Sequence, residues 1–167
     1  MDRKIVLRDG AAVPSIGQGT WYLGENPGTF DAEKKALLQG IECGMTLIDT
    51  AEMYGDGEAE ELVGKVISEA DREKLFIVSK VYPFHAGRDR IFTSCEDSLQ
   101  RLGTDRLDLY LLHWRGQIPL SETVECMEQL IRDGKILRWG VSNFDTEDME
   151  ELWSVPDGDH CMVNQVL

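Results

Sequence analysis

Short apolar segments of strand length alternate along this chain with longer segments of helical periodicity, and that alternation limits the folds open to it. The expected strands cover residues 13–19, 46–49, 75–80, 107–113 and 136–142, with a sixth from about residue 162. Strands that alternate with helices pair in parallel, because each helix carries the chain back across the sheet. The pattern therefore predicts repeated βα units on a single parallel sheet.

The helix expected after Gly57 shows the helical pattern best. Its apolar stripe consists of Ala59, Leu62, Val63, Val66 and Ile67. Residues at this spacing share one helix face, so Glu60, Glu61 and Lys65 are expected to face solvent. Gly44 and Gly134 are expected to end two other helices, and Ser121 is expected to cap the start of the second.

The number of βα units bears on the architecture. An eight-stranded parallel barrel takes about 250 residues, whereas this chain has 167. The sequence predicts one domain over residues 1–167, an α/β fold of the (β/α)8 TIM-barrel family that is truncated after about five βα units and a sixth strand. Residues 5–7 and 13–16, on either side of Asp9-Gly10, predict an N-terminal β-hairpin ahead of the first strand or merging with it.

Composition excludes several classes of function. With 17 Lys and Arg against 31 Asp and Glu, the net charge is -14, and phosphate contacts need clustered cations, so no nucleic-acid partner is expected. The sequence has no apolar stretch that would suit a signal peptide or a membrane span, which predicts a cytoplasmic protein. The four cysteines are scattered without metal-binding spacing, so reduced thiols and no metal are expected.

Asp49, Tyr54, Lys80 and His113 each fall at or just beyond the carboxyl end of an expected strand, where a parallel barrel holds its chemistry. A free phenol has a pKa of about 10, so a tyrosine that donates protons near neutrality needs a neighbour that favours phenolate. Lys80 suits that task, a carboxylate at Asp49 would keep the lysine charged, and a neutral His113 could orient a carbonyl oxygen. The set predicts protonation of the alkoxide formed when hydride reaches a carbonyl carbon.

Four segments together resemble the aldo-keto reductases. Residues 47–55 (LIDTAEMYG) are similar to the signature of that family, residues 78–81 (VSKV) to its lysine strand, and residues 105–114 (DRLDLYLLHW) to its histidine strand. The segment from Gly134 to residues 140–144 (GVSNF) is similar to its amide-binding turn. The resemblance runs from the hairpin to Gln165 and implies a barrel reductase that moves hydride from NADPH, less readily NADH, to small aldehydes or ketones.

The resemblance also implies a role for each matching residue. Tyr54 would be the general acid, Lys80 and Asp49 the pair that tunes it, and His113 the group that positions the carbonyl. Cofactor contacts would come from the following residues: Gly19, Thr20, Trp21, Asp49, Ser142, Asn143 and Gln165. Trp21, Tyr82 and Trp114 would line the substrate mouth. The segment that covers the cofactor pyrophosphate in this family, and the basic residues that bind its adenosine 2′-phosphate, would belong to later strands and loops.

Two alternatives stay open at this point. Some relatives of this barrel family regulate membrane channels, so the chain could be a non-catalytic, cofactor-sensing binding module. It could also be an inactive truncated fragment, and the unpaired edges of an open parallel sheet would then favour self-association. His85 and His160 fall in expected loops and are predicted to be ordinary solvated residues.

Overall fold

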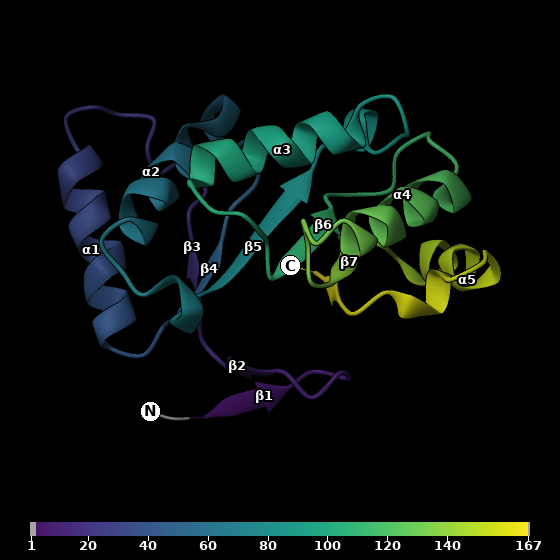
Figure 1. The fold of residues 1–167 in the computed structure, drawn as a ribbon, viewed down its shortest axis with the longest axis horizontal. Helices are drawn as coiled ribbons and strands as arrows, with labels where there is room; N and C mark the ends of the chain where they lie inside the picture. The colour runs from purple at the N-terminus through teal and green to yellow at the C-terminus, as the bar shows by residue number, and fades with distance from the viewer. Residues whose placement is uncertain (1–2, 167) are drawn as a thin grey trace.

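Six parallel strands, hydrogen-bonded in chain order, form the centre of the molecule (Figure 1). The computed structural model describes residues 3–166; Met1, Asp2 and Leu167, the last residue of the expected sixth strand, lie outside that range. The strands are β3 (Gln18–Gly19), β4 (Leu47–Asp49), β5 (Phe76–Val81), β6 (Leu109–Leu112), β7 (Trp139–Ser142) and β8 (Asn164–Gln165). Every pairing between them is parallel, as the alternation of strands and helices predicts.

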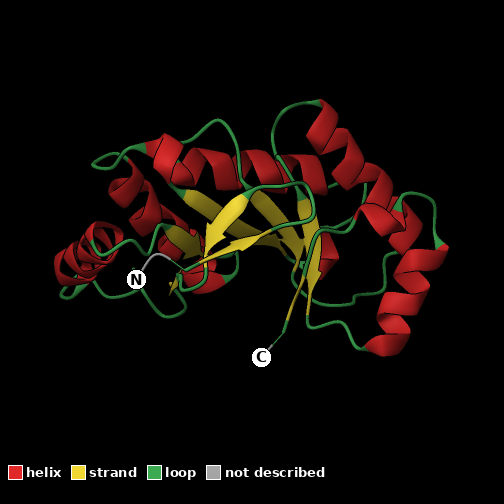
Figure 2. Cartoon of the chain, turned by 90° about the horizontal axis from the view of Figure 1, so that it is seen from below, coloured by secondary structure: helices red, strands yellow, loops and turns green. Residues whose placement is uncertain are grey.

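Within residues 3–166, the five helices of the chain cover the outer side of this curled sheet (Figure 2). They are α1 (Phe30–Glu42), α2 (Glu58–Ile67), α3 (Ile91–Leu102), α4 (Leu120–Arg132) and α5 (Thr146–Ser154). Short 3-10 turns occur as η1 (Tyr54–Gly57), η2 (Arg72–Lys74), η3 (Pro83–His85) and η4 (Gly158–His160). Gly44 (φ 90°) and Gly134 (φ 71°) take left-handed conformations after α1 and α4, which confirms the predicted helix ends.

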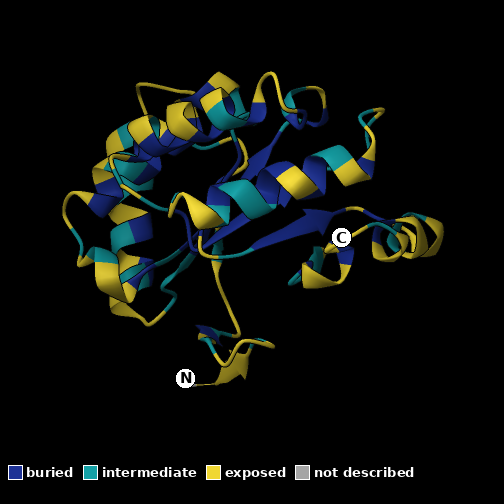
Figure 3. Ribbon diagram, turned by 45° about the vertical axis from the view of Figure 1, so that its right-hand side comes forward, coloured by how far each residue is buried: buried dark blue, intermediate teal, exposed yellow. Residues whose placement is uncertain are grey.

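The sheet is apolar on both faces. A large cluster fills the space between the sheet and the helices, and Ile77 of β5 belongs to it. Val78 points to the other face, where it packs with Leu109 and Leu111, as the two-residue period of a strand requires. The strands and the inner sides of the helices are accordingly the buried parts of the molecule, and most of the hairpin is exposed (Figure 3).

The predicted first strand, residues 13–19, is wrong as a single element. Its beginning forms β2 (Ala12–Pro14), which pairs antiparallel with β1 (Lys4–Val6), and its end forms β3. The hairpin ladder continues one residue past Pro14, since the Ser15 N–H donates to the Arg3 carbonyl at 3.0 Å. The chain then passes closely under β4, since a Cβ at Gly17 would lie 2.6 Å from Leu47 Cδ2. The hairpin and the first sheet strand are therefore separate, whereas the sequence pattern merges them.

Two expectations about helix surfaces are also wrong. Glu60 is completely buried (0% exposed), while Glu61 and Lys65 are exposed as predicted. The Glu60 carboxylate accepts hydrogen bonds from Ser79 Oγ (2.5 Å) and Arg101 Nε (2.7 Å), so it joins α2 to β5 and α3. Ser121 does not cap α4, because the helix begins at Leu120 and Pro119 holds the cap position.

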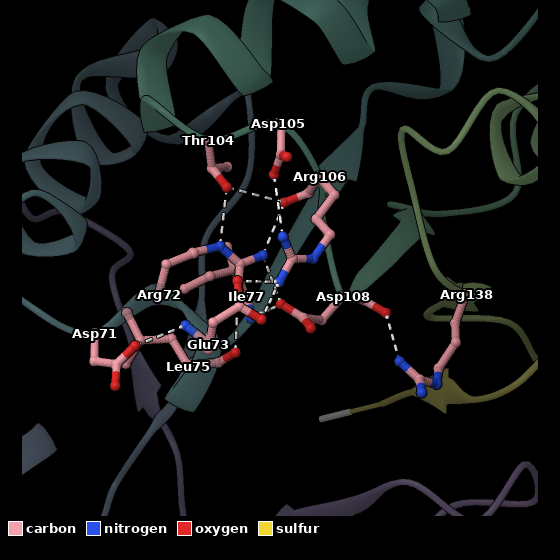
Figure 4. Close-up of polar contacts among 10 residues, drawn as sticks. All are labelled: Asp71, Arg72, Glu73, Leu75, Ile77, Thr104, Asp105, Arg106, Asp108 and Arg138. Carbon is pink, nitrogen blue, oxygen red and sulfur yellow. Dashed lines mark hydrogen bonds and ion pairs between the residues drawn. The ribbon is translucent and has the colours of Figure 1, made fainter.

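A network of charged and polar residues connects the segments at the amino ends of β5 and β6 (Figure 4). The Arg72 guanidinium donates to Asp108 Oδ2 (2.8 Å), Thr104 Oγ1 (2.9 Å) and the Arg106 carbonyl (2.8 Å). Asp108 Oδ2 also accepts from the Ile77 N–H at 2.9 Å. The network therefore joins the starts of β5 and β6, at the end of a parallel sheet where interactions generally contribute to stability.

The outermost strands, β3 and β8, each have one sheet neighbour within residues 3–166. Self-association through these edges stays a prediction. No helix in the described part of the chain combines the length and apolar character that a membrane crossing requires.

Candidate active site

The carboxyl ends of the six strands surround a cavity of about 550 Å³. Asp49 ends β4, Lys80 is the second-last residue of β5, and His113 directly follows β6. Tyr54 begins η1, the turn between β4 and α2. All four line the cavity, so the structure brings together the four residues that the sequence predicts to act jointly.

Lys80 contacts two of the other three residues, Asp49 and Tyr54. Its ammonium lies 2.6 Å from Asp49 Oδ1, 2.9 Å from the Thr50 carbonyl and 3.1 Å from the Tyr54 hydroxyl. The lysine side chain is only 3% exposed. A buried ammonium needs partners for its charge and its protons, and Asp49 and Thr50 provide them. The remaining donor points at the phenol oxygen, where a positive charge stabilises a developing phenolate.

His113 packs edge-on against the Tyr54 ring. The two ring centroids are 5.7 Å apart with the planes at 74°. Burial, together with the positive charge of Lys80, lowers the pKa of His113 from 6.5 to about 4. The imidazole is therefore neutral near neutrality and can donate a hydrogen bond to a carbonyl oxygen without transferring its proton.

The low pKa of His113 predicts a specific pH dependence of stability. Between pH 6.5 and about 4 the unfolded chain binds a proton on this residue that the folded chain resists, so folding is penalised as the pH falls. Relative to His113→Asn, the wild-type free energy of unfolding should fall by up to about 3 kcal/mol from pH 7 to pH 4. Urea denaturation of both proteins at each pH measures this, and a difference that is constant with pH would contradict it.

The residues expected to hold a carboxamide also meet at the cavity. Ser142 ends β7 and donates its hydroxyl to the Gln165 carbonyl at 2.9 Å. Asn143 follows with a left-handed φ of 58° and donates to the His113 carbonyl at 3.2 Å. The Gln165 amide donates to Asp49 Oδ2 at 3.0 Å, which links β8 to β4 across the cavity mouth.

Of the three aromatic residues predicted to line the substrate mouth, two line the cavity and one does not. Gly19, the last residue of β3, and the following Thr20 and Trp21 line the cavity, and Thr20 Oγ1 donates to the Asp49 carbonyl at 3.0 Å. Trp114 lines the cavity next to His113. Tyr82 is not among the cavity-lining residues and instead packs behind Trp114, with ring centroids 5.1 Å apart. Its role in the substrate mouth therefore stays a prediction.

Two cavity-lining residues, and one residue outside the lining, were missed by the sequence reasoning. Met53 and Val166 line the cavity, and their positions next to Tyr54 and Gln165 are the signal that could have identified them. Glu52 reaches from the Tyr54 loop to the loop after β5, which no spacing in the sequence indicates. Within the described residues, no cluster of His, Cys, Asp or Glu suits a metal ion.

A curled sheet of parallel βα units thus holds a lysine-linked phenol and a neutral imidazole at the carboxyl ends of its strands, the end where parallel barrels hold their sites. The family model described as "Aldo/keto reductase family" matches residues 15–166. This chain belongs to the aldo/keto reductase family, and the predicted barrel fold is confirmed by the solved structures that it matches.

The chain is 55% identical over 168 residues to methylglyoxal reductase YeaE of Escherichia coli K12. The alignment covers 100% of this chain and 59% of that relative. The chain is 38% identical to glyoxal reductase of Bacillus subtilis 168, of which it covers 56% with 97% of its own length.

A crystal structure of a Klebsiella pneumoniae aldo/keto reductase in complex with NADP and acetate matches with 57% identity and a TM-score of 0.96, over all of this chain and 59% of that one. A Bombyx mori aldo-keto reductase in complex with NADP matches with 30% identity and a TM-score of 0.86, over 98% of this chain and 57% of that one. The chain thus spans somewhat under two thirds of the length of each of these relatives.

Proposed function

We propose that this chain carries the carbonyl-reducing site of an NADPH-dependent reductase that converts small aldehydes or ketones to alcohols. The observation that carries the proposal is the Lys80 ammonium, which contacts both Asp49 (2.6 Å) and the Tyr54 hydroxyl (3.1 Å) in a cavity also lined by His113. A phenol held against a buried, permanently partnered ammonium is suited to give up its proton to an alkoxide.

Each residue has one task in this proposal. His113, neutral because its pKa is lowered to about 4, donates a hydrogen bond that orients the substrate oxygen. Tyr54 Oη then passes its proton to that oxygen. Lys80 stabilises the negative charge left on Oη, and Asp49 keeps Lys80 charged.

The residues at the ends of β7 and β8 fit the carboxamide of a nicotinamide. A hydroxyl at Ser142 and side-chain amides at Asn143 and Gln165 line one side of the cavity, and together they can both donate to a carbonyl and accept from an amide nitrogen. NADPH, when bound, supplies the hydride. Support for this cofactor comes from the Klebsiella and Bombyx structures, which hold NADP.

The substrate class follows from the cavity and from the relatives. Trp21, whose ring centroid is 6.3 Å from that of Tyr54, and Trp114, 4.9 Å from that of His113, both line the cavity, and aromatic walls favour small or flat compounds. Two relatives are named for the reduction of methylglyoxal and glyoxal. We therefore propose small aldehydes and α-dicarbonyl compounds as substrates.

The test is NADPH consumption by the purified chain with methylglyoxal, followed by the absorbance of the reduced nicotinamide. We expect oxidation that requires the aldehyde, saturates with its concentration and yields the hydroxy product. NADPH binding seen by fluorescence without any consumption would contradict the reductase proposal and favour the non-catalytic binding module.

A further inference from the structure

We propose that Glu52 is a positioning residue that fixes the aromatic wall of the cavity and thereby sets which carbonyl compounds are accepted. This inference rests on the proposed reductase function. The assignment starts from an acidic side chain that makes no contact with the four catalytic candidates but is only 10% exposed.

The Glu52 carboxylate has two partners on the loop after β5. Its Oε1 accepts the backbone N–H of Tyr82 at 2.5 Å and lies 3.1 Å from His85 Nδ1. His85, expected from the sequence to be an ordinary solvated residue, is thus partnered in the structure. A carboxylate that accepts from a backbone N–H and an imidazole forms charge-assisted hydrogen bonds, which are stronger than neutral ones.

The place of Glu52 in the chain makes this contact a link between two functional loops. Glu52 lies two residues before Tyr54, and Tyr82 lies two residues after Lys80. The Glu52 backbone N–H also donates to the Lys80 carbonyl at 3.3 Å. The main-chain contact joins the loop that bears the phenol to the strand end that bears the ammonium and does not depend on the carboxylate, whereas the side chain joins the same loop to the segment after β5.

Packed aromatic rings extend the link to the cavity. The Tyr82 ring stacks on Phe84 (5.4 Å between centroids) and meets Trp114 edge-on at 5.1 Å. The Trp114 ring centroid in turn lies 4.9 Å from that of His113, and Trp114 lines the cavity. Since Tyr82 does not line the cavity itself, its effect on a substrate passes through the orientation of Trp114.

Removal of the Glu52 acceptor frees the Tyr82 loop. Glu52→Ala leaves the Tyr82 N–H without its partner, whereas Glu52→Gln retains a carbonyl oxygen that can accept the same hydrogen bond. The conservative variant should therefore restore the wall. A mobile Trp114 side chain packs less closely against a flat substrate that fills the cavity. A small substrate depends less on that contact, so its binding changes less.

The first readout needs no turnover. Amide hydrogen exchange at Tyr82, measured by NMR on the purified chain, should be faster in Glu52→Ala by about tenfold or more and nearly unchanged in Glu52→Gln. The near-ultraviolet circular dichroism band of the Tyr82–Trp114 pair, identified by its loss in Trp114→Phe, should weaken in Glu52→Ala alone. Exposed Glu61→Ala is the matched control for loss of one carboxylate. Unchanged exchange and an unchanged band in Glu52→Ala, with the fold intact by far-ultraviolet spectra, would overturn the positioning role.

The second readout is a comparison of methylglyoxal with benzaldehyde. In Glu52→Ala we expect the KM for benzaldehyde to rise about fivefold or more, with kcat nearly unchanged and methylglyoxal kinetics little affected. Equal effects on both aldehydes would overturn the role in specificity. Absence of turnover in the wild type would overturn the proposed function, and the exchange and dichroism measurements would still decide whether Glu52 positions the wall.

Discussion

Replacement of Tyr54 by phenylalanine should lower the NADPH-dependent reduction of methylglyoxal by about a hundredfold to ten-thousandfold, the range that a general acid contributes. The substitution removes only the hydroxyl that lies 3.1 Å from Lys80 Nζ. The ring contacts with Trp21 (6.3 Å) and His113 (5.7 Å) do not depend on that hydroxyl. Cofactor binding, measured by fluorescence titration, should therefore be unchanged while turnover is lost.

Tyr82→Phe is the matched control for this loss. It deletes the same atom from a tyrosine whose side chain lies outside the cavity lining but in the same region of the molecule. We expect it to keep most of the activity. A Tyr54→Phe protein that turns over as fast as the wild type would exclude the phenol as the proton donor.

Replacement of Glu60 by alanine should reduce the free energy of unfolding by about 3–5 kcal/mol, the cost of breaking a buried ion pair. The side chain is 0% exposed, and burial raises its pKa while the Arg101 guanidinium opposes that rise. Without the carboxylate, Arg101 and Ser79 both lose their partner between α2, α3 and β5. Urea denaturation followed by circular dichroism measures the change.

Glu61→Ala tests whether the effect belongs to the buried pair. Glu61 is the next residue of α2 and is exposed, so its removal should change the free energy of unfolding by less than about 0.5 kcal/mol. Similar losses for Glu60→Ala and Glu61→Ala would show that the pair with Arg101 contributes no more than an ordinary helix charge.

The sequence predicted the parallel sheet and the four clustered site residues because both depend on periodicity along the chain. The carboxyl ends of parallel strands meet at one edge of a sheet. Locating the strands that end at or near Asp49, Lys80 and His113 therefore also locates the site. The expected strand at 46–49 begins one residue before β4, and the expected strand at 75–80 is shifted by one residue from β5. Gly44 and Gly134 marked helix ends because only a residue without Cβ takes those conformations easily.

The features that the sequence did not predict depend on contacts between distant segments. Glu60 looks like a solvent-facing residue of α2, and only the approach of Arg101 and Ser79 makes its burial possible. The break between β2 and β3 goes with a change of partner, since β2 pairs with β1 and β3 pairs with β4. Glu52 reaches Tyr82 across 30 residues of sequence, and a pattern read along one strand or helix contains no record of such a pair.

Isotope transfer tests the central claim most directly. Methylglyoxal is incubated with the chain and NADPH that carries deuterium at the transferable position, and the alcohol product is analysed by mass spectrometry. A reductase site built from Tyr54, Lys80, Asp49 and His113 predicts one deuterium on the former carbonyl carbon and a solvent-derived proton on its oxygen. A product without deuterium, or no product beyond that of Tyr54→Phe, would contradict the assignment.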